Sequence, residues 1–121
     1  MNEKEKKLVM KILQLYDELC RLTYDGSRGA HCMLPPNVHH YIRYIEKIRD
    51  NVAILCYEFD SDVLSEFNLR DLDDVLHGYE LKELKVESKR MSEQRLRDKL
   101  EFVTSQIGSA INPLLKGIGN I

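Results

Sequence analysis

The stretch VHHYIRYIEKIRDNVAILCYEF, residues 38–59, decides the fold class of this chain. Its apolar and aromatic side chains recur at steps of three and four residues, with charged residues between them: Val38, Tyr41, Ile42, Ile45, Ile48, Val52, Leu55 and Phe59. An α-helix has about 3.6 residues per turn, so this spacing places them on one helical face. Because proline suits a first helical position and asparagine can cap free N–H groups, we predict a helix from Pro36 or Asn37 to about Glu58.

The same periodicity predicts one long helix before this stretch and another after it. The N-terminal stripe consists of Leu8, Val9, Ile12, Leu15, Tyr16, Leu19 and Leu22. It predicts a helix from about Glu3 to Thr23. The C-terminal stripe consists of Leu96, Leu100, Val103, Ile107 and Ile111. Because Pro113 lacks a backbone N–H, we expect it to kink or end that last helix, with Asn112 and Pro113 capping one final turn.

The region between these helices carries weaker helical signals. Asp60-Ser61-Asp62 can cap a short helix through Phe67, and Asn68 can cap a second short segment. Residues 79–91 fit either a helix or a hairpin, and we favour a helix because Glu, Lys, Leu and Arg dominate and no turn dipeptide splits the run. The whole pattern predicts an all-α fold, a small antiparallel bundle of four to five helices forming a single domain over residues 1–121.

Composition describes an ordinary globular protein of 121 residues, with 43% hydrophobic and 31% charged residues. No apolar run approaches the roughly 18 residues that a membrane-spanning helix needs, so we expect no membrane segment. The three cysteines, Cys20, Cys32 and Cys56, are odd in number and form no C-x-x-C pair. This usage favours a reducing compartment, and we expect a cytoplasmic protein.

Charge is distributed unevenly along the chain. Residues 51–80 contain one basic residue against eight acidic ones, while the segments on either side are mildly basic. An acidic middle is unlike the continuous basic surface that long nucleic acid requires, so no such partner is expected. A patch of one sign can instead steer a basic partner protein. The residues that we assign to such a docking surface are Glu58, Asp60, Asp62, Glu66, Asp71, Asp73 and Asp74.

A second candidate site follows the first helix. Residues 24–36 contain turn-forming glycines and a Pro-Pro pair, which predict a long loop leading into the next helix. Free N–H groups at a helix start favour anions, so a phosphate or carboxylate could bind there. The cationic side chains predicted to hold it are Arg28, His31, His39, His40 and Arg43. A zinc site built from these histidines and Cys32 fits no standard spacing, so we predict neither a metal nor a cofactor.

The segment RDLDDVLH, residues 70–77, resembles the R-x4-6-H motif of HEPN-type ribonucleases. That resemblance implies a helical dimer that cuts RNA without a metal ion, with Arg70 and His77 at the dimer cleft. Three aspartates lie inside the motif and would repel an RNA backbone. We therefore keep this ribonuclease as the alternative to a protein that only binds.

These observations favour a binding protein over an enzyme. We expect it to occupy or sequester a partner protein or a phosphate-bearing small ligand, as an inhibitor, an immunity factor or an anti-defence factor does. The first and last helices carry long stripes flanked by charged residues, which also suit contacts with a second copy of the chain. We therefore expect a homo-oligomer.

Overall fold

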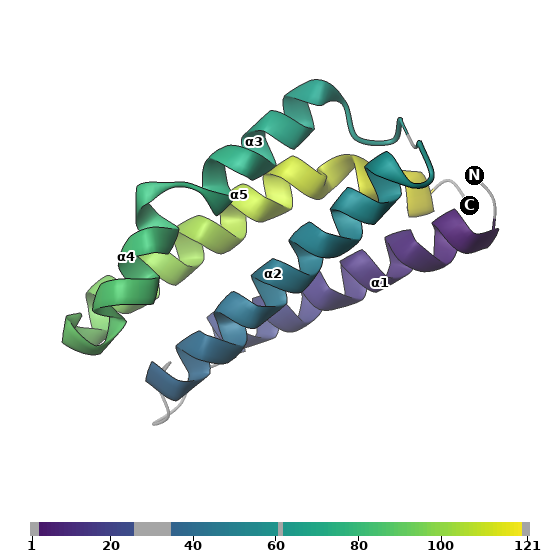
Figure 1. Ribbon diagram of the computed structural model, residues 1–121. Coiled ribbons are helices and arrows are strands. Elements are labelled where there is room, and N and C mark those ends of the chain that lie inside the picture. The colour runs from purple at the N-terminus through teal and green to yellow at the C-terminus, as the bar shows by residue number, and fades with distance from the viewer. Residues whose placement is uncertain (1–2, 26–34, 61, 120–121) are drawn as a thin grey trace.

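The computed structural model describes residues 3–25, 35–60 and 62–119 of the chain (Figure 1). Helices make up nearly all of these residues and no strand occurs among them, which confirms the all-α prediction. The elements in chain order are α1 (Glu3–Cys20), a π-helical turn η1 (Arg21–Asp25), α2 (Pro35–Tyr57), α3 (Glu66–Leu76), α4 (Tyr79–Glu87), a 3-10 turn η2 (Ser88–Arg90) and α5 (Glu93–Gly119).

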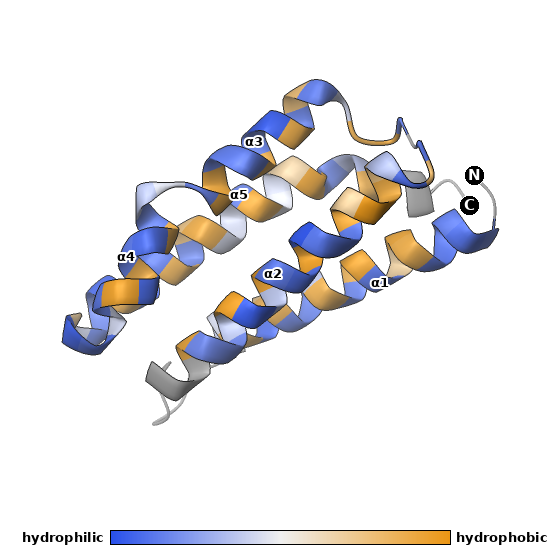
Figure 2. Cartoon of the chain, in the orientation of Figure 1, coloured by the Kyte–Doolittle hydropathy of each residue, from blue (hydrophilic) through white to orange (hydrophobic). Residues whose placement is uncertain are grey.

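The helices pack in two groups that share one core. Helices α1 and α2 lie side by side and run in opposite directions (Figure 1). Helices α3 and α4 follow one another along α5, and α5 also contacts α1. Along each helix, hydrophobic segments alternate with hydrophilic ones (Figure 2). This alternation gives every long helix one face for the core and one for solvent.

The core is formed by the apolar stripes that the sequence predicts. Its most deeply buried members include Val9, Ile12 and Leu19 of α1, Tyr41, Ile45, Ile48 and Leu55 of α2, and Leu100, Val103, Ile107 and Ile111 of α5. Each fully buried side chain of this size contributes about 1.5–3 kcal/mol through removal of apolar surface from water. Packing between the stripes, rather than intrinsic helix propensity, therefore supplies most of the stability.

The first helix changes its winding near its end. The sequence predicts an α-helix to Thr23, but α1 ends at Cys20 and a π-helical turn follows. In this wider turn the buried Thr23 hydroxyl donates a hydrogen bond to the Leu19 carbonyl at 2.8 Å. The same oxygen lies 2.8 Å from the Thr104 hydroxyl of α5. The wider turn therefore accompanies a polar contact between η1 and α5.

The connection between α2 and α3 corrects one prediction. Among its described residues there is no short helix through Phe67, because Asp60 adopts a left-handed conformation (φ 50°) that ends the helical path after α2. Helix α3 begins at Glu66, with Ser65 rather than Asn68 as its cap. The Ser65 side chain accepts a hydrogen bond from the Asn68 N–H at 3.2 Å, and Asn68 accepts one from the Ser65 N–H at 3.2 Å. This reciprocal pair is a capping box.

The structure settles two further questions about helix boundaries. Residues 79–87 form helix α4 rather than a hairpin, as predicted. We expected Pro113 to kink or end the last helix; it does not end it, because α5 continues through it to Gly119. Proline at this position leaves the Ser109 carbonyl without its helical partner. Ser109 is exposed, so water can satisfy that carbonyl.

Candidate functional site

The predicted anion-binding residues fall on the first turns of α2, as far as the structure describes them. Arg28 and His31 lie outside the described residues. His39, His40 and Arg43 are all exposed on α2. His40 and Arg43 line a single small hollow of about 110 Å³. His39 is not among its lining residues, so the structure brings together only part of the predicted set.

Two side chains outside the predicted set complete this hollow. Tyr44 and Lys47 form the rest of its lining, and the Lys47 ammonium lies 5.7 Å from the centre of the Tyr44 ring. His40, Arg43, Tyr44 and Lys47 are spaced by three, one and three residues, which places them on one helical face. That spacing is readable in the sequence, although the glycines and prolines of the preceding loop are the more conspicuous signal. We name these four residues the α2 cationic hollow.

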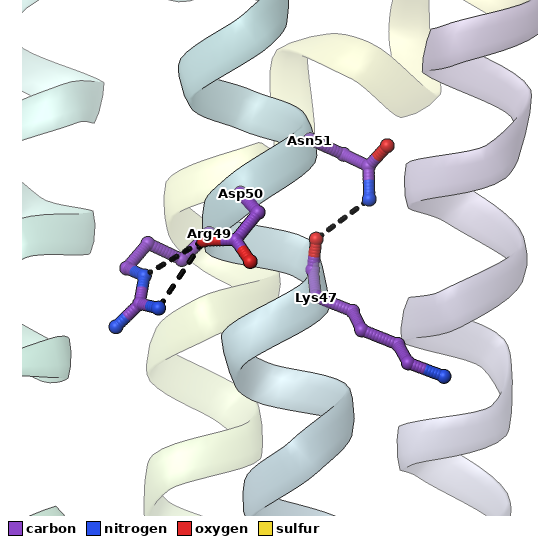
Figure 3. A network of polar contacts seen from close by, with 4 residues as sticks. All are labelled: Lys47, Arg49, Asp50 and Asn51. Carbon is purple, nitrogen blue, oxygen red and sulfur yellow. Dashed lines mark hydrogen bonds and ion pairs between the residues drawn. The ribbon is translucent and has the colours of Figure 1, made fainter.

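The α2 cationic hollow carries the positive charges of Arg43 and Lys47. None of its lining residues is acidic. Within the described part of the chain, no carboxylate lies within ion-pair distance of Arg43 or Lys47. By contrast, Arg49 on the same helix is paired with Asp50, whose Oδ1 lies 3.2 Å from Nη2 (Figure 3). Figure 3 also shows the Lys47 and Arg49 side chains leaving α2 in opposite directions.

The seven predicted docking acids extend from the end of α2 into α3, and the structure does not bring them all to one groove. Glu58 and Asp60 lie at the end of α2, Asp62 lies in the connection and Glu66 starts α3, and all four are exposed. The three aspartates of α3 divide between two grooves that run on either side of this helix. Asp73 lines the groove toward α2, whereas Asp71 and Asp74 line the groove toward α5. No three metal-type ligands among the described residues gather closely enough to hold an ion.

The groove between α2 and α3, which we name the α2–α3 groove, has a mainly apolar lining and a volume of about 80 Å³. It lies where α3 packs against α5 while α2 packs against α1. Its lining residues are Arg49, Val52, Ala53, Cys56 and Tyr57 of α2, and Leu69, Leu72, Asp73 and Leu76 of α3. The last turns of α2 are largely hydrophobic (Figure 2). Burial raises the pKa of the Cys56 thiol, so it stays protonated and acts as an apolar wall.

One aromatic side chain of the α2–α3 groove lining stands exposed: Tyr57, at the end of α2, is 85% exposed. Phe67 on α3 is 70% exposed, but its position along the helix places it on the side of α3 opposite Leu69, Leu72 and Leu76. Ile54, one turn before Tyr57, is also exposed. Exposed aromatic and apolar residues beside a groove are typical of protein-binding surfaces. The acids here are conspicuous in the sequence. Ile54 and Tyr57 are not, because they fall outside the apolar stripe of α2 and no other pattern marks them.

The groove between α3 and α5 differs in character. It has a volume of about 250 Å³ and three acidic lining residues, Asp71, Asp74 and Glu80. An adjoining open hollow of about 500 Å³ shares Glu80 and Phe102 with it. Phe102 of α5 is half-exposed between the two. No sequence signal marks this arrangement, because Phe102 falls outside the stripe that defines α5.

The basic residues beside Phe102 are held by a buried carboxylate. Glu83 of α4 is only 5% exposed and forms ion pairs with Arg95 and with Lys99, whose Nζ lies 2.8 Å from Oε2. The hydrogen bond from Lys99 lowers the pKa of Glu83; burial opposes this shift, and Tyr79 and Arg95 add to it. These ion pairs tie α4 to α5, with the Lys99 side chain largely buried and the Arg95 side chain largely exposed.

Three buried hydroxyl groups, those of Thr23, Tyr41 and Thr104, lie in contact with one another in the core. The Tyr41 hydroxyl lies 2.8 Å from Thr104 Oγ1 and donates to the Leu100 carbonyl at 3.1 Å. Thr104 also contacts Thr23, so three hydroxyl hydrogens serve four contacts. At any moment one of the two hydroxyl pairs is therefore without a directed hydrogen. We assign these hydroxyls a structural role in aligning η1, α2 and α5.

Arg70 and His77, the residues of the ribonuclease-like motif, are both exposed on or at the end of α3. They are separated by two helical turns, so they project from the same side of the helix. Asp73 and Asp74 are exposed between them. The side of α3 that would receive RNA therefore carries negative charge next to both residues.

Comparison with known proteins provides no relative: no protein-family model, curated protein or solved structure matches the chain. None of the helices in the described ranges combines the length and the apolar character that a bilayer span needs. The geometry of the grooves and of the α2 cationic hollow must therefore carry the assignment of function.

Proposed function

We propose that this chain is a helical binding protein that holds a basic amphipathic helix of a partner protein in the α2–α3 groove. The scaffold for this activity would be the small antiparallel bundle of four to five helices that the sequence predicts. The observation that carries the proposal is a mainly apolar groove between two helices, whose lining includes the acidic Asp73 and the exposed aromatic side chain of Tyr57. Such a protein would act as an inhibitor or a sequestering factor, because it would bind its partner without changing it chemically.

The groove fits the recognition mode in which a helix lays its apolar face between two others. In that mode a few apolar anchor residues, spaced by three or four positions, supply most of the affinity. A volume of about 80 Å³ suits one such anchor at a time. Tyr57, which lines the groove and is exposed, can then cover the anchor and exclude water. A partner helix therefore needs an apolar stripe that is narrow and continuous.

The charges around the groove define the flanks of the partner helix. Asp73 lines the groove, and Arg49, itself paired with Asp50, is the basic residue in its lining. Glu58, Asp60, Asp62 and Glu66 are exposed along the connection between the two wall helices and at the start of α3. These acids accelerate encounter with lysine- or arginine-rich helices and disfavour acidic ones. Because they are exposed, salt screens their effect. The proposal therefore predicts a partner helix with basic flanks and binding that weakens as salt rises.

Binding is a better account than RNA cleavage for the α3 surface. Asp73 and Asp74 bring negative charge beside Arg70 and His77, and an RNA backbone would meet that charge first. A basic protein helix meets the same charge favourably. We therefore propose the binding function, and we add self-association and a cytoplasmic location as parts of the proposal.

A designed peptide can stand in for the partner helix and test the proposal. The probe is a fluorescein-labelled peptide of leucine and lysine at helical spacing, and its control has the same composition in scrambled order. We expect fluorescence anisotropy to report binding of the probe that is at least about tenfold tighter than that of the scrambled control. Raising the salt from about 0.1 M to about 1 M should weaken binding of the probe.

Variants assign the binding to the groove. Ala53→Glu places a charge in the apolar lining, and the double change Glu66→Lys with Asp73→Lys reverses charge around it. Each should weaken binding at least about tenfold. Glu87→Lys, at the exposed end of α4, is the matched control and should leave binding unchanged. Equal effects of the control and the groove variants, or no preference for the amphipathic peptide, would reject the proposal.

A further inference from the structure

We propose that the α2 cationic hollow binds the phosphate group of a small molecule through His40, Arg43, Tyr44 and Lys47. This site is independent of the α2–α3 groove. Its residues lie in the first half of α2, whereas the groove is formed by residues from Arg49 onward. The opposite directions of Lys47 and Arg49 in Figure 3 separate the two surfaces further.

The donors in the hollow match the chemistry of a phosphomonoester. The Arg43 guanidinium offers a planar fork that can pair with two phosphate oxygens, and the Lys47 ammonium adds a compact positive charge. His40 and Tyr44 add ring N–H and phenol O–H donors from the same helical face. A phosphomonoester carries about −1.5 to −2 charges at neutral pH, so several cations are needed to balance it. A carboxylate, with one charge and two oxygens, would use fewer of these donors.

The electrostatic surroundings leave these donors available. Some surface cations of this chain have an acidic neighbour, as Arg21 has in Asp17 at 3.2 Å and Arg49 has in Asp50. In the described part of the chain, neither Arg43 nor Lys47 is paired in this way. Like charges that are placed close together on one helical face repel one another without a counter-ion. A bound dianion removes that repulsion while it uses the free donors.

The size of the hollow sets the class of ligand. At about 110 Å³, it is well below the range of about 300–1,000 Å³ that encloses drug-sized molecules. It can therefore surround a phosphate group, while the remainder of the molecule extends into solvent. Two sources share this chemistry: free inorganic phosphate, and a phosphorylated metabolite such as a nucleoside monophosphate.

Titration calorimetry with the intact chain at low ionic strength tests the site. The probes are inorganic phosphate, adenosine monophosphate and, as the carboxylate control, acetate. We expect both phosphates to bind and acetate to bind at least about tenfold more weakly. Equal affinities for the two phosphates would identify the phosphate group itself as the ligand, whereas tighter binding of the nucleotide would identify a phosphorylated metabolite. Either pattern supports the site.

Matched variants test whether phosphate binds at these residues. Arg43→Ala and Lys47→Ala should each weaken phosphate binding at least about tenfold, since each removes a charge-assisted contact. Arg49→Ala, an arginine on the same helix that points away from the hollow, should leave it unchanged. All three positions are exposed, so the helical circular dichroism should persist in every variant. Absence of phosphate binding, or an equal loss in Arg49→Ala, would overturn the inference and leave the peptide-binding proposal untouched.

Discussion

The close approach of Gly108 to Tyr16 is a sharp constraint on a single residue. A Cβ added at Gly108 would lie 2.1 Å from the Tyr16 hydroxyl and 2.8 Å from the ring carbon that bears it. That hydroxyl donates a hydrogen bond to the Thr104 carbonyl at 3.3 Å. The glycine is therefore the means by which α1 and α5 approach one another at this level of the core.

Gly108→Ala should destabilise the protein by about 1–3 kcal/mol, although alanine favours helix. The reason is that the Tyr16 ring must move and give up its contact with α5. Urea denaturation of the single variant measures this change in the free energy of unfolding. In a Tyr16→Ala background the same glycine change should cost much less, because the clash has gone. Additive effects of the two changes would contradict this account.

The buried tyrosines predict a loss of stability at high pH. Burial raises the pKa of Tyr41 above its usual value of about 10. The folded state therefore keeps a proton that the unfolded state loses, so this contribution is complete below about pH 10 and declines above it. Between pH 8 and pH 11, Tyr41→Phe should lose about 1.4 kcal/mol less stability than the unaltered chain. Urea midpoints at both pH values test this, and identical pH dependence of the two proteins would refute it.

At the scale of elements, Glu83 connects α4 to α5. Its pKa is lowered, chiefly by the hydrogen bond from Lys99, so its stabilising effect is present above the unfolded value of about 4.3 and is lost as pH falls through the folded value. Glu83→Gln should lower the melting temperature at pH 7, and the difference from the unaltered chain should shrink as pH falls below about 4.3 and through the folded pKa. Glu87→Gln on the same helix is the exposed control. A melting difference that does not shrink as pH falls would indicate a packing defect instead.

Helix bodies are easier to predict than helix ends. The stripes of α1, α2 and α5 are predictable because many regularly spaced residues carry the same signal. The start of α3 is fixed by the capping box in which Ser65 and Asn68 bond to one another's backbone. In the sequence alone, either residue could be the cap, so the first residue of the helix cannot be predicted. Helix α5 can continue through Pro113 because Ser109, one turn earlier, is exposed and its carbonyl can bond to water. No local sequence pattern shows whether that residue is exposed.

The candidate sites are predictable only in part, for a related reason. Acidic residues around α3 are visible in the composition, but their division between two grooves depends on which helices pack together. Likewise, the spacing of His40 and Arg43 extends to Lys47 along one face, yet the hollow appears only in three dimensions. The burial of Glu83 cannot be predicted from the sequence either, because the hydrophobic pattern of α4 gives no reason to place a charged residue in the core. Tertiary packing supplies what periodicity cannot.

For the whole molecule, we predict self-association through α1 or α5. Met10 of α1 is 62% exposed and Phe102 of α5 is 51% exposed, so both helices offer apolar side chains on their outer faces. Sedimentation velocity at micromolar concentration should report a species larger than the 14.2 kDa chain. Met10→Glu or Phe102→Glu should convert it to a monomer without loss of helix, because neither side chain belongs to the core. A monomer in the unaltered protein would refute the prediction.

The central claim is that the α2–α3 groove receives a basic amphipathic helix. Titrating the ¹⁵N-labelled chain with the unlabelled leucine–lysine peptide, and following the backbone amide shifts, tests it most directly. We predict that the largest shifts fall at residues of both groove walls, at Val52, Ala53 and Cys56 on α2 and at Leu69 and Asp73 on α3. Shifts confined to α1 or to the exposed face of α5, or no shifts at all, would contradict the claim.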